Sequence, residues 1–260
     1  MTPAPIRVAV FGAGGRMGAT VCQAVADDRG LALVAAVDPR HAGETAVGGL
    51  VIAGAAEALA DAGAQVAVDF TVAAAARENL AWCAHHGVHA VVGTTGLSDA
   101  DLADLRSLFA GGTNCVLAPN FAIGAVLMMR FAEQAAPYFD SAEVIELHHD
   151  NKRDAPSGTA MLTAERLAAA SSEWAADPTT TEVVPGARGG EGPGGIRIHA
   201  VRLRGLVAHQ EVLLGTAGQT LTIRHDSTDR VSFMPGVLLA VKAVADRPGL
   251  TVGLDALLGM

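Results

Sequence analysis

The first half of the chain alternates short apolar runs with longer stretches of helical period. The apolar runs predict strands at residues 6–11, 32–37, 66–70, 88–92 and 114–118. The stretches between them predict helices at 16–29, 72–86 and 99–110, with a further short helix ahead of the third strand. Continuous apolar strands that alternate with helices are typical of a parallel sheet covered on both faces. The sequence therefore predicts a Rossmann-like, doubly wound α/β domain.

The pattern changes after about residue 120, where longer helices and consecutive strands follow. It predicts helices at 122–138, 159–171 and 235–246, and strands at 142–149, 196–204, 207–215 and 219–226. Residues 173–195 are rich in Pro, Gly and Thr and show little periodicity, so we expect a loop of low order there. Together these elements indicate a second, α+β domain that carries a mixed or antiparallel sheet.

The composition and charge of the chain argue against some classes of binding partner. Half of the residues are hydrophobic, so a substantial core can be buried. The formal net charge of -9 argues against general nucleic-acid binding, which needs a positive face to replace phosphate counterions. No apolar run reaches the roughly 18 residues that span a bilayer, and residues 1–5 contain no basic segment of a secretory signal. We therefore expect a cytoplasmic protein with neither membrane nor nucleic-acid partners.

A glycine-rich loop joins the first predicted strand to the first predicted helix. Its sequence is Gly12-Ala13-Gly14-Gly15-Arg16-Met17-Gly18, and its glycines are best described as GxxGxxG, because Met17 takes the place of a third glycine in GxGxxG. Such glycines permit a tight turn and let backbone N–H groups approach a pyrophosphate at the helix N-terminus. The context favours dinucleotide binding, and the alternative is a glycine-rich turn without a ligand.

Asp38 ends the second predicted strand, 20 residues beyond Gly18. A carboxylate there can accept hydrogen bonds from the adenosine ribose, which favours NAD. Arg16 and Arg40 flank the same position, and a guanidinium can instead hold the 2′-phosphate of NADP. Asp38 can also be an ordinary turn former. The choice between NADH and NADPH therefore stays open at this stage.

Two further loops follow predicted parallel strands at their carboxyl ends, where open α/β sheets bind ligands. They are Gly93-Thr94-Thr95-Gly96 and Ala118-Pro119-Asn120-Phe121. Both can line the nicotinamide pocket. Both can equally be ordinary turns.

The segment from Glu146 to Ala160 contains the densest group of chemically active residues. His148 and His149 end a strand, where neighbouring side chains point in different directions, and a histidine can exchange a proton near neutral pH. Lys152 adds a cation, and Ser157-Gly158-Thr159 opens a helix whose N–H groups can bind a carboxylate. This set suits an anionic substrate that must be protonated. The alternatives are a solvated loop or a metal site, although no HExxH-like ligand spacing is present.

The motifs GxxGRMG, GTTG, APNF and ExHHxxKxDAPSGT resemble those of the 4-hydroxy-tetrahydrodipicolinate reductase (dihydrodipicolinate reductase) family, in the same order and over nearly the whole chain. The similarity is greatest to actinobacterial members. The resemblance implies a cofactor site of Gly12, Ala13, Gly14, Gly15, Arg16, Met17, Asp38, Gly93, Thr94, Thr95, Ala118, Pro119, Asn120 and Phe121. It implies that His148 donates a proton, that Lys152 donates a second proton or stabilises charge, and that His149, Gly158 and Thr159 bind substrate carboxylates.

The resemblance also implies an activity and a domain organisation. The enzyme would use NADH, NADPH or both to reduce 4-hydroxy-tetrahydrodipicolinate, a small cyclic dicarboxylate, to tetrahydrodipicolinate in diaminopimelate and lysine biosynthesis, without a metal. Residues 1–120, completed by residues 230–260, would bind the dinucleotide. Residues 121–229 would bind substrate and join the chains of a homotetramer.

Two other classes of function compete with this interpretation. A semialdehyde dehydrogenase would need a cysteine nucleophile, and Cys115 is the candidate. However, Cys22, Cys83 and Cys115 all lie in apolar stretches without CxxC spacing, which predicts reduced, buried thiols. A dinucleotide-sensing regulator would bind cofactor without turnover, but it usually carries a DNA-binding module, and the sequence shows no sign of one.

Overall fold

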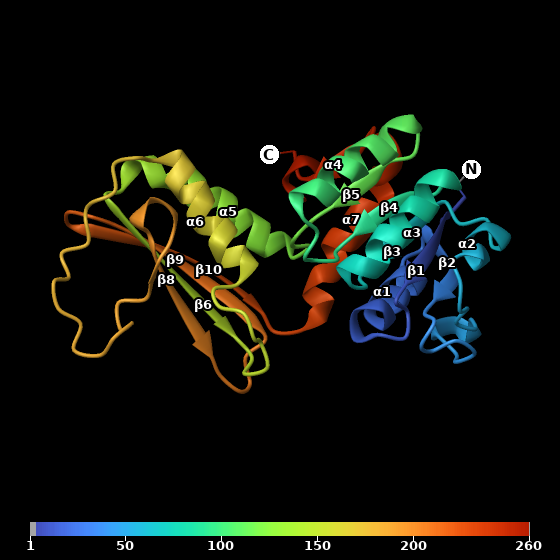
Figure 1. Cartoon of the computed structure of the whole chain (residues 1–260), viewed down its shortest axis with the longest axis horizontal. Helices are drawn as coiled ribbons and strands as arrows, with labels where there is room; N and C mark the ends of the chain where they lie inside the picture. Colours follow the sequence, from blue (N-terminus) through green and yellow to red (C-terminus); the bar gives the residue numbers. More distant parts are fainter. Residues whose placement is uncertain (1–3, 260) are drawn as a thin grey trace. The chain divides into compact units, whose positions relative to one another are not determined.

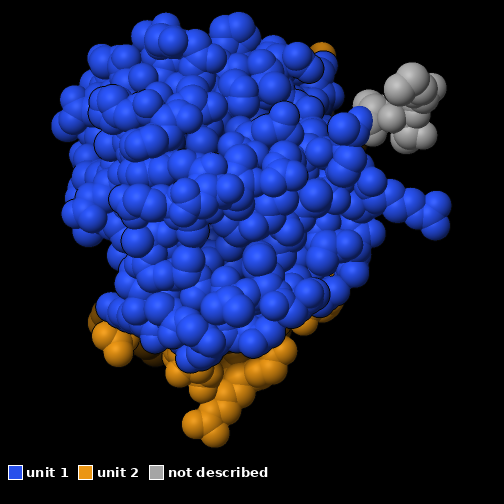
Figure 2. All heavy atoms as spheres, turned by 90° about the vertical axis from the view of Figure 1, so that its right-hand side faces the viewer, with its two compact units in different colours: residues 1–121, 233–260 blue, residues 122–232 orange. Residues whose placement is uncertain are grey.

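The computed structural model describes residues 4–259, which form two compact units. Unit 1 contains the chain up to Phe121 and again from Phe233, and unit 2 runs from Ala122 to Ser232 (Figures 1 and 2). The C-terminal segment thus returns to the unit that the N-terminal segment forms.

Unit 1 is built on a six-stranded sheet in the order β11-β5-β4-β3-β1-β2, in which every paired neighbour is parallel. The strands are β1 (Ile6–Phe11), β2 (Leu31–Val37), β3 (Val66–Asp69), β4 (His89–Val92), β5 (Cys115–Leu117) and β11 (Leu250–Val252). The helices are α1 (Arg16–Asp27), α2 (Glu57–Asp61), α3 (Ala73–His85), α4 (Asp99–Leu108) and α7 (Met234–Ala243).

Helices cover both faces of this sheet. Helix α1 packs beside α7, and α3 packs beside α4. On β1, Val8 and Val10 face one layer and Ala9 and Phe11 face the other, and all four are at most 2% exposed. Because both faces are buried, the strands are continuous apolar runs, and the predicted doubly wound α/β domain is confirmed.

Strand β11 is an element of unit 1 that the apolar pattern did not predict. It has only three residues, lies between Gly249 and Gly253, and adds a sixth parallel strand beside β5. Buried Asn114 fastens it, because its Nδ2 donates to the carbonyls of Val244 and Ala245 and its Oδ1 accepts from the Gly249 N–H. The buried polar side chain of Asn114 therefore helps to hold the start of β11 in place.

Unit 2 is built on a five-stranded sheet in the order β10-β9-β6-β8-β7. The strands are β6 (Ser141–His148), β7 (Gly190–Glu191), β8 (Arg197–Arg202), β9 (Ala208–Thr216) and β10 (Gln219–Ser227). Strand β6 runs parallel to β8 and antiparallel to β9, so the sheet is mixed. Helices α5 (Ile123–Ala135) and α6 (Gly158–Ala170) pack against each other and against this sheet (Figure 1).

The pairing in unit 2 differs in one respect from the simplest arrangement of consecutive strands. Strands β9 and β10 form a tight hairpin, but β6 lies between β8 and β9, so these two consecutive strands are not neighbours. Strand β6 is therefore central, with a partner on each side; His148 is its last residue and His149 follows it directly.

The segment between α6 and β7 has no regular structure from residue 171 to 189, yet ion pairs attach it to the sheet. The Asp177 carboxylate lies 2.9 Å from the Arg197 guanidinium on β8. Arg188 contacts Asp177 and also donates a 2.6 Å bond to Glu143 on β6. Hydrophobic periodicity cannot reveal such an attachment, because the side chains that make it are charged.

Candidate active site

The glycine-rich loop of unit 1 is packed so closely that only glycine fits at two of its positions. A Cβ at Gly18 would lie 2.0 Å from the Gly12 carbonyl oxygen, and a Cβ at Gly14 would lie 2.2 Å from the ring of His41. Gly12 has a φ of +70°, which lets the chain turn from β1 toward α1. This close approach of helix and strand is what a dinucleotide loop requires.

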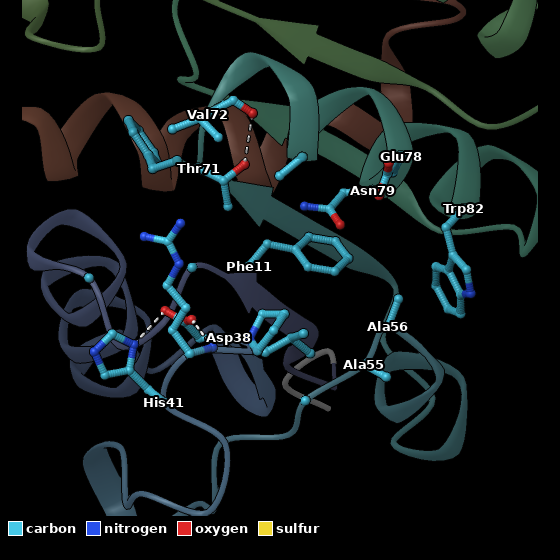
Figure 3. A pocket seen from close by; sticks show the side chains of 18 of the residues that line it. Phe11, Asp38, His41, Ala55, Ala56, Thr71, Val72, Glu78, Asn79 and Trp82 are labelled. Atoms are coloured by element: carbon cyan, nitrogen blue, oxygen red, sulfur yellow. Dashed lines mark hydrogen bonds and ion pairs between the residues drawn. The ribbon is translucent and has the colours of Figure 1, made fainter.

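Asp38 fastens this loop to the end of β2. Its carboxylate accepts the Gly14 N–H at 3.2 Å and the Arg40 N–H at 3.0 Å, and it lies 3.0 Å from His41 Nδ1 (Figure 3). These bonds hold the carboxylate in place. Asp38 is only 8% exposed, and it lines a cavity. Sequence reasoning missed His41, whose spacing of three residues from Asp38 was the available signal.

The cavity beside Asp38 has a volume of about 620 Å³. Its lining includes Gly12 and Gly15 of the loop, Asp38 and Arg40 after β2, and Trp82 of α3 (Figure 3). It lies at the carboxyl ends of the strands beside the point where the strand order reverses, the usual ligand position in open α/β sheets.

A second buried carboxylate, Asp69, organises the ends of β3 and β4. It is 1% exposed and accepts hydrogen bonds from the Thr71 N–H and hydroxyl, the Thr94 hydroxyl and the Asn79 amide, at 2.7 to 2.9 Å. The Thr71 methyl in turn lies against Gly12. Asp69 was missed by sequence reasoning, although it is the one charged residue in an otherwise apolar strand.

The other two loops expected at the cofactor site lie around Phe70. Gly93 follows β4, and a Cβ there would overlap the Phe70 ring. Phe121 is 1% exposed, with its ring centre 5.6 Å from that of Phe70, so its side chain belongs to the core of unit 1. The Thr94 hydroxyl is directed to Asp69, and Thr95 and Pro119 are exposed.

In unit 2, His148 contacts Glu146, which is fully buried. Its Oε2 accepts a 2.5 Å hydrogen bond from His148 Nδ1, and its Oε1 accepts the Ser157 N–H at 3.1 Å. The Arg202 guanidinium donates one 2.8 Å bond to each oxygen. Burial raises the Glu146 pKa, but the bonds from His148 and Arg202 outweigh it and lower that pKa to about 2.

Four donors thus surround one ionised carboxylate at the end of β6. An ionised carboxylate only accepts hydrogen bonds, so His148 Nδ1 must carry the hydrogen, and Nε2 is the ring nitrogen left to exchange a proton. Sequence reasoning recognised Glu146 as part of a motif without giving it a role. Arg202 was missed, because it lies 56 residues away along the chain.

The remaining candidate residues of unit 2 lie on the turn after β6 and at the start of α6. Lys152 Nζ lies 2.7 Å from Asp154, and His149 Nδ1 is buried with no hydrogen-bond partner among the described residues. Ser157 caps α6 by accepting the Ala160 N–H, so Gly158 and Thr159 are the first two helical residues. The N–H groups of a first helical turn favour an anion at that end.

Residues 4–259 contain neither a metal-binding cluster nor a membrane-spanning helix. No group of three or more His, Cys, Asp or Glu side chains is arranged to hold a metal ion. Within the same residues, no helix is long and apolar enough to cross a membrane.

The fold and the two polar sites define a Rossmann-type oxidoreductase with a second α+β unit. The family model described as "Dihydrodipicolinate reductase, N-terminus" matches residues 6–121, and the model for the C-terminus of the same family matches residues 124–258. The chain belongs to the dihydrodipicolinate reductase family.

Individual relatives agree with this assignment. The chain is 54% identical to the 4-hydroxy-tetrahydrodipicolinate reductase of Cutibacterium acnes, over 98% of this chain and 99% of the relative. It is 53% identical to that of Thermobifida fusca, over 98% and 100%. The solved structure of a dipicolinate-bound dihydrodipicolinate reductase from Paenisporosarcina sp. TG-14 matches with a TM-score of 0.87 and 40% identity, over 97% of this chain and 99% of that one.

More distant solved structures share the fold alone. An amine dehydrogenase from Mycobacterium smegmatis has a TM-score of 0.67 at 16% identity. An aspartate semialdehyde dehydrogenase from Vibrio cholerae has a TM-score of 0.56 at 11% identity.

Proposed function

We propose that this protein reduces 4-hydroxy-tetrahydrodipicolinate to tetrahydrodipicolinate with NADH or NADPH, a step of diaminopimelate and lysine biosynthesis. One hydride and one proton enter the substrate, and its 4-hydroxyl group leaves as water. The observation that carries the proposal is full-length similarity to reductases of that name, together with the histidine, lysine and helix N-terminus gathered in unit 2.

Unit 1 supplies the residues for the dinucleotide. The loop Gly12 to Met17 would hold the pyrophosphate at the start of α1, and Asp38 would accept the adenosine ribose hydroxyls. The loops at Gly93–Thr95 and Ala118–Phe121 would border the nicotinamide. When bound, the reduced nicotinamide supplies the hydride. The close packing at Gly18 and the cavity beside Asp38 support this assignment.

Unit 2 supplies the residues for the substrate. Its carboxylates would bind at the N-terminus of α6, through Gly158 and Thr159, and to His149. His148, with Nδ1 held by Glu146, would give a proton from Nε2. Lys152 would neutralise negative charge that develops as hydride arrives, and Asp154 holds its ammonium group until the substrate competes for it.

Assembly and location complete the proposal. Strand β10 lies at the edge of the second sheet, and an unpaired strand edge favours pairing with another chain. We infer a homotetramer joined through this sheet, working in the cytoplasm. Sedimentation of the purified protein at several concentrations tests the assembly, because a monomer at all of them would contradict it.

The activity is tested by generating the substrate in place. A synthase that condenses pyruvate with aspartate semialdehyde provides it, and the purified protein is then added with NADH or NADPH while nicotinamide absorbance is followed. We expect oxidation that depends on the synthase. Cofactor binding without any oxidation would contradict the proposed function and favour a sensor or another reductase.

Variants of two residues test the proposed roles in that assay. His148→Gln should lower kcat by about 10²- to 10⁴-fold with a smaller change in KM, because a general acid acts mainly in the transition state. Lys152→Ala should damage both kcat and KM. Unchanged kinetics in either variant would remove that residue from its role.

A further inference from the structure

The buried environment of His148 contains two charges of opposite sign that no catalytic role yet explains. Glu146 lies on the same strand two residues earlier, so both side chains project from the same face of β6. Arg202 pairs with His148 across strands β6 and β8. All of these residues belong to unit 2.

We infer that Glu146 and Arg202 form a positioning pair that sets both the tautomer and the charge of His148. This inference rests on the proposed function, in which His148 donates a proton. Glu146 is the residue in contact, with 2.5 Å between its Oε2 and His148 Nδ1. Arg202 acts through Glu146, because it donates to both carboxylate oxygens and fixes the orientation of the carboxylate plane.

The geometry leaves Glu146 no other arrangement. Each of its oxygens accepts two hydrogen bonds, one from Arg202 and one from either His148 or the Ser157 N–H. Arg202 is itself held, since it also donates to the carbonyls of Val201 and Asp154. A buried carboxylate with four hydrogen bonds is held rigidly, and rigidity is what a proton donor bound to it needs in order to face its substrate.

The same carboxylate joins the proton donor to the proposed carboxylate site. Ser157 is the N-cap of α6, and its backbone N–H is bound by Glu146. Glu146 thus orients His148 with one oxygen and the start of α6 with the other. The two halves of the proposed substrate site are therefore fixed to each other through a single side chain.

The charges of the pair predict opposite effects on His148. Removing the carboxylate leaves the guanidinium of Arg202 as the nearest charge, which disfavours protonated His148. Removing the guanidinium leaves an unneutralised carboxylate, which favours it. Two other cations near the end of β6 are paired, Lys152 with Asp154 and Arg204 with Asp150. His209 on β9 is bound to Asp226.

A matched control is present on the same strand. Glu143 also lies on β6 and also contacts a histidine and an arginine, with bonds of 2.7 Å to His199 and 2.6 Å to Arg188. Glu143→Gln therefore makes the same chemical change in the same strand, away from the proposed substrate site.

The first experiment reads His148 directly by NMR of protein labelled with ¹⁵N-histidine, with His148→Gln used to assign the signal. In the unaltered protein, neutral His148 should carry its hydrogen on Nδ1. Removing the carboxylate in Glu146→Gln should disfavour protonated His148, and removing the guanidinium in Arg202→Gln should favour it, so the His148 signal should change in opposite directions with pH in the two variants. Glu143→Gln should leave it unchanged.

This measurement needs no substrate, so its outcome is separate from that of the proposed function. Hydrogen on Nε2 in the unaltered protein would overturn the inference without any variant, even if the variants fail to fold. A change of His148 in the same direction in Glu146→Gln and Arg202→Gln would also overturn it. General damage to the fold would produce such a result, whereas loss of opposite charges should change His148 in opposite directions.

The second experiment uses turnover once the activity is established. Glu146→Gln should lower kcat by about 10²-fold, raise KM by a smaller factor, and move the high-pH limb of the kcat profile to lower pH. Arg202→Gln should move that limb to higher pH, and Glu143→Gln should behave as the unaltered enzyme. An active Glu146→Gln enzyme with an unshifted profile would overturn the inference and leave the proposed function intact.

Discussion

Thr94 Oγ1 donates a 2.7 Å hydrogen bond to Asp69 Oδ1, and this buried bond joins the end of β4 to the end of β3. The same Asp69 oxygen also accepts from Thr71, whose methyl group touches Gly12. A bond at the loop after β4 is thereby connected to the glycine-rich loop after β1.

We therefore expect Thr94→Val to weaken both stability and cofactor binding. The variant keeps the shape of the side chain and removes one donor to a buried carboxylate, which should cost about 1–3 kcal/mol in the free energy of unfolding. Urea unfolding measures that loss, and calorimetry with NADH measures affinity. Thr251→Val makes the same change in β11, and an equal loss of NADH affinity there would contradict the proposed link.

Gly18 tests the packing of the dinucleotide loop. Gly18→Ala places a methyl group 2.0 Å from the Gly12 carbonyl oxygen, so α1 must move away from β1. We expect a loss of about 1–3 kcal/mol in stability and NADH binding weakened by at least tenfold. Gly111→Ala is the control, because a Cβ there meets nothing within 4 Å. Normal NADH affinity in Gly18→Ala would show that the loop is not the pyrophosphate site.

Asp38 tests the cofactor preference. Its carboxylate would bind ribose hydroxyls and repel a 2′-phosphate, and it also holds the Gly14 N–H. Asp38→Asn should therefore weaken NADH by about tenfold and NADPH by less, which raises the ratio of NADPH to NADH turnover. The exposed Asp61→Asn removes an equal charge from the same unit and should leave the ratio unchanged. An unchanged ratio in Asp38→Asn would place the adenosine ribose elsewhere.

The three cysteines separate this reductase from an enzyme with a thiol nucleophile. Burial raises the pKa of the Cys22 thiol to about 11 and that of Cys83 to about 12, and it raises the pKa of Cys115 as well. Because the thiolate is the reactive form, a thiol-specific reagent should leave the native protein unmodified and active. Denatured protein should show three reactive thiols per chain. Activity lost in step with modification would contradict the proposed mechanism.

The elements that sequence reasoning identified share a physical reason. Strands buried on both faces must be apolar, so β1 to β5 were visible as runs, and local motifs placed Asp38 at the end of β2 and His148 at the end of β6. Helix α6 was visible because Ser157 caps it and small apolar residues follow. These features depend on residues that are near each other along the chain.

The features that sequence reasoning missed depend on distant residues. Arg202 reaches Glu146 across 56 positions, and Asn114 reaches Ala245 across 131, so no local pattern marks either bond. Strand β11 is too short to show a period, and β6 lies between two strands that are consecutive in the sequence. The candidate residues could be found from motifs, but the polar side chains that hold them could not.

Because the pKa of Glu146 is low, the stability of unit 2 should fall at acidic pH. Bonds from His148 and Arg202 overcome burial and lower that pKa to about 2, below the value near 4.3 of an unfolded chain. A lowered folded pKa contributes stability that is complete above the unfolded value and is lost as pH falls toward 2, on the order of 3 kcal/mol.

With Trp82 replaced by Phe, Trp174 alone reports unfolding of unit 2 in urea between pH 7 and pH 2. We expect the stability of this protein to fall more steeply below pH 4.5 than that of its Glu146→Gln variant, whose glutamine cannot titrate. Glu173 is exposed, so the Glu173→Gln variant should keep the steep fall. If the free energy of unfolding falls in parallel with pH in Glu146→Gln and in the unaltered protein, then Glu146 is not the carboxylate that this stability depends on.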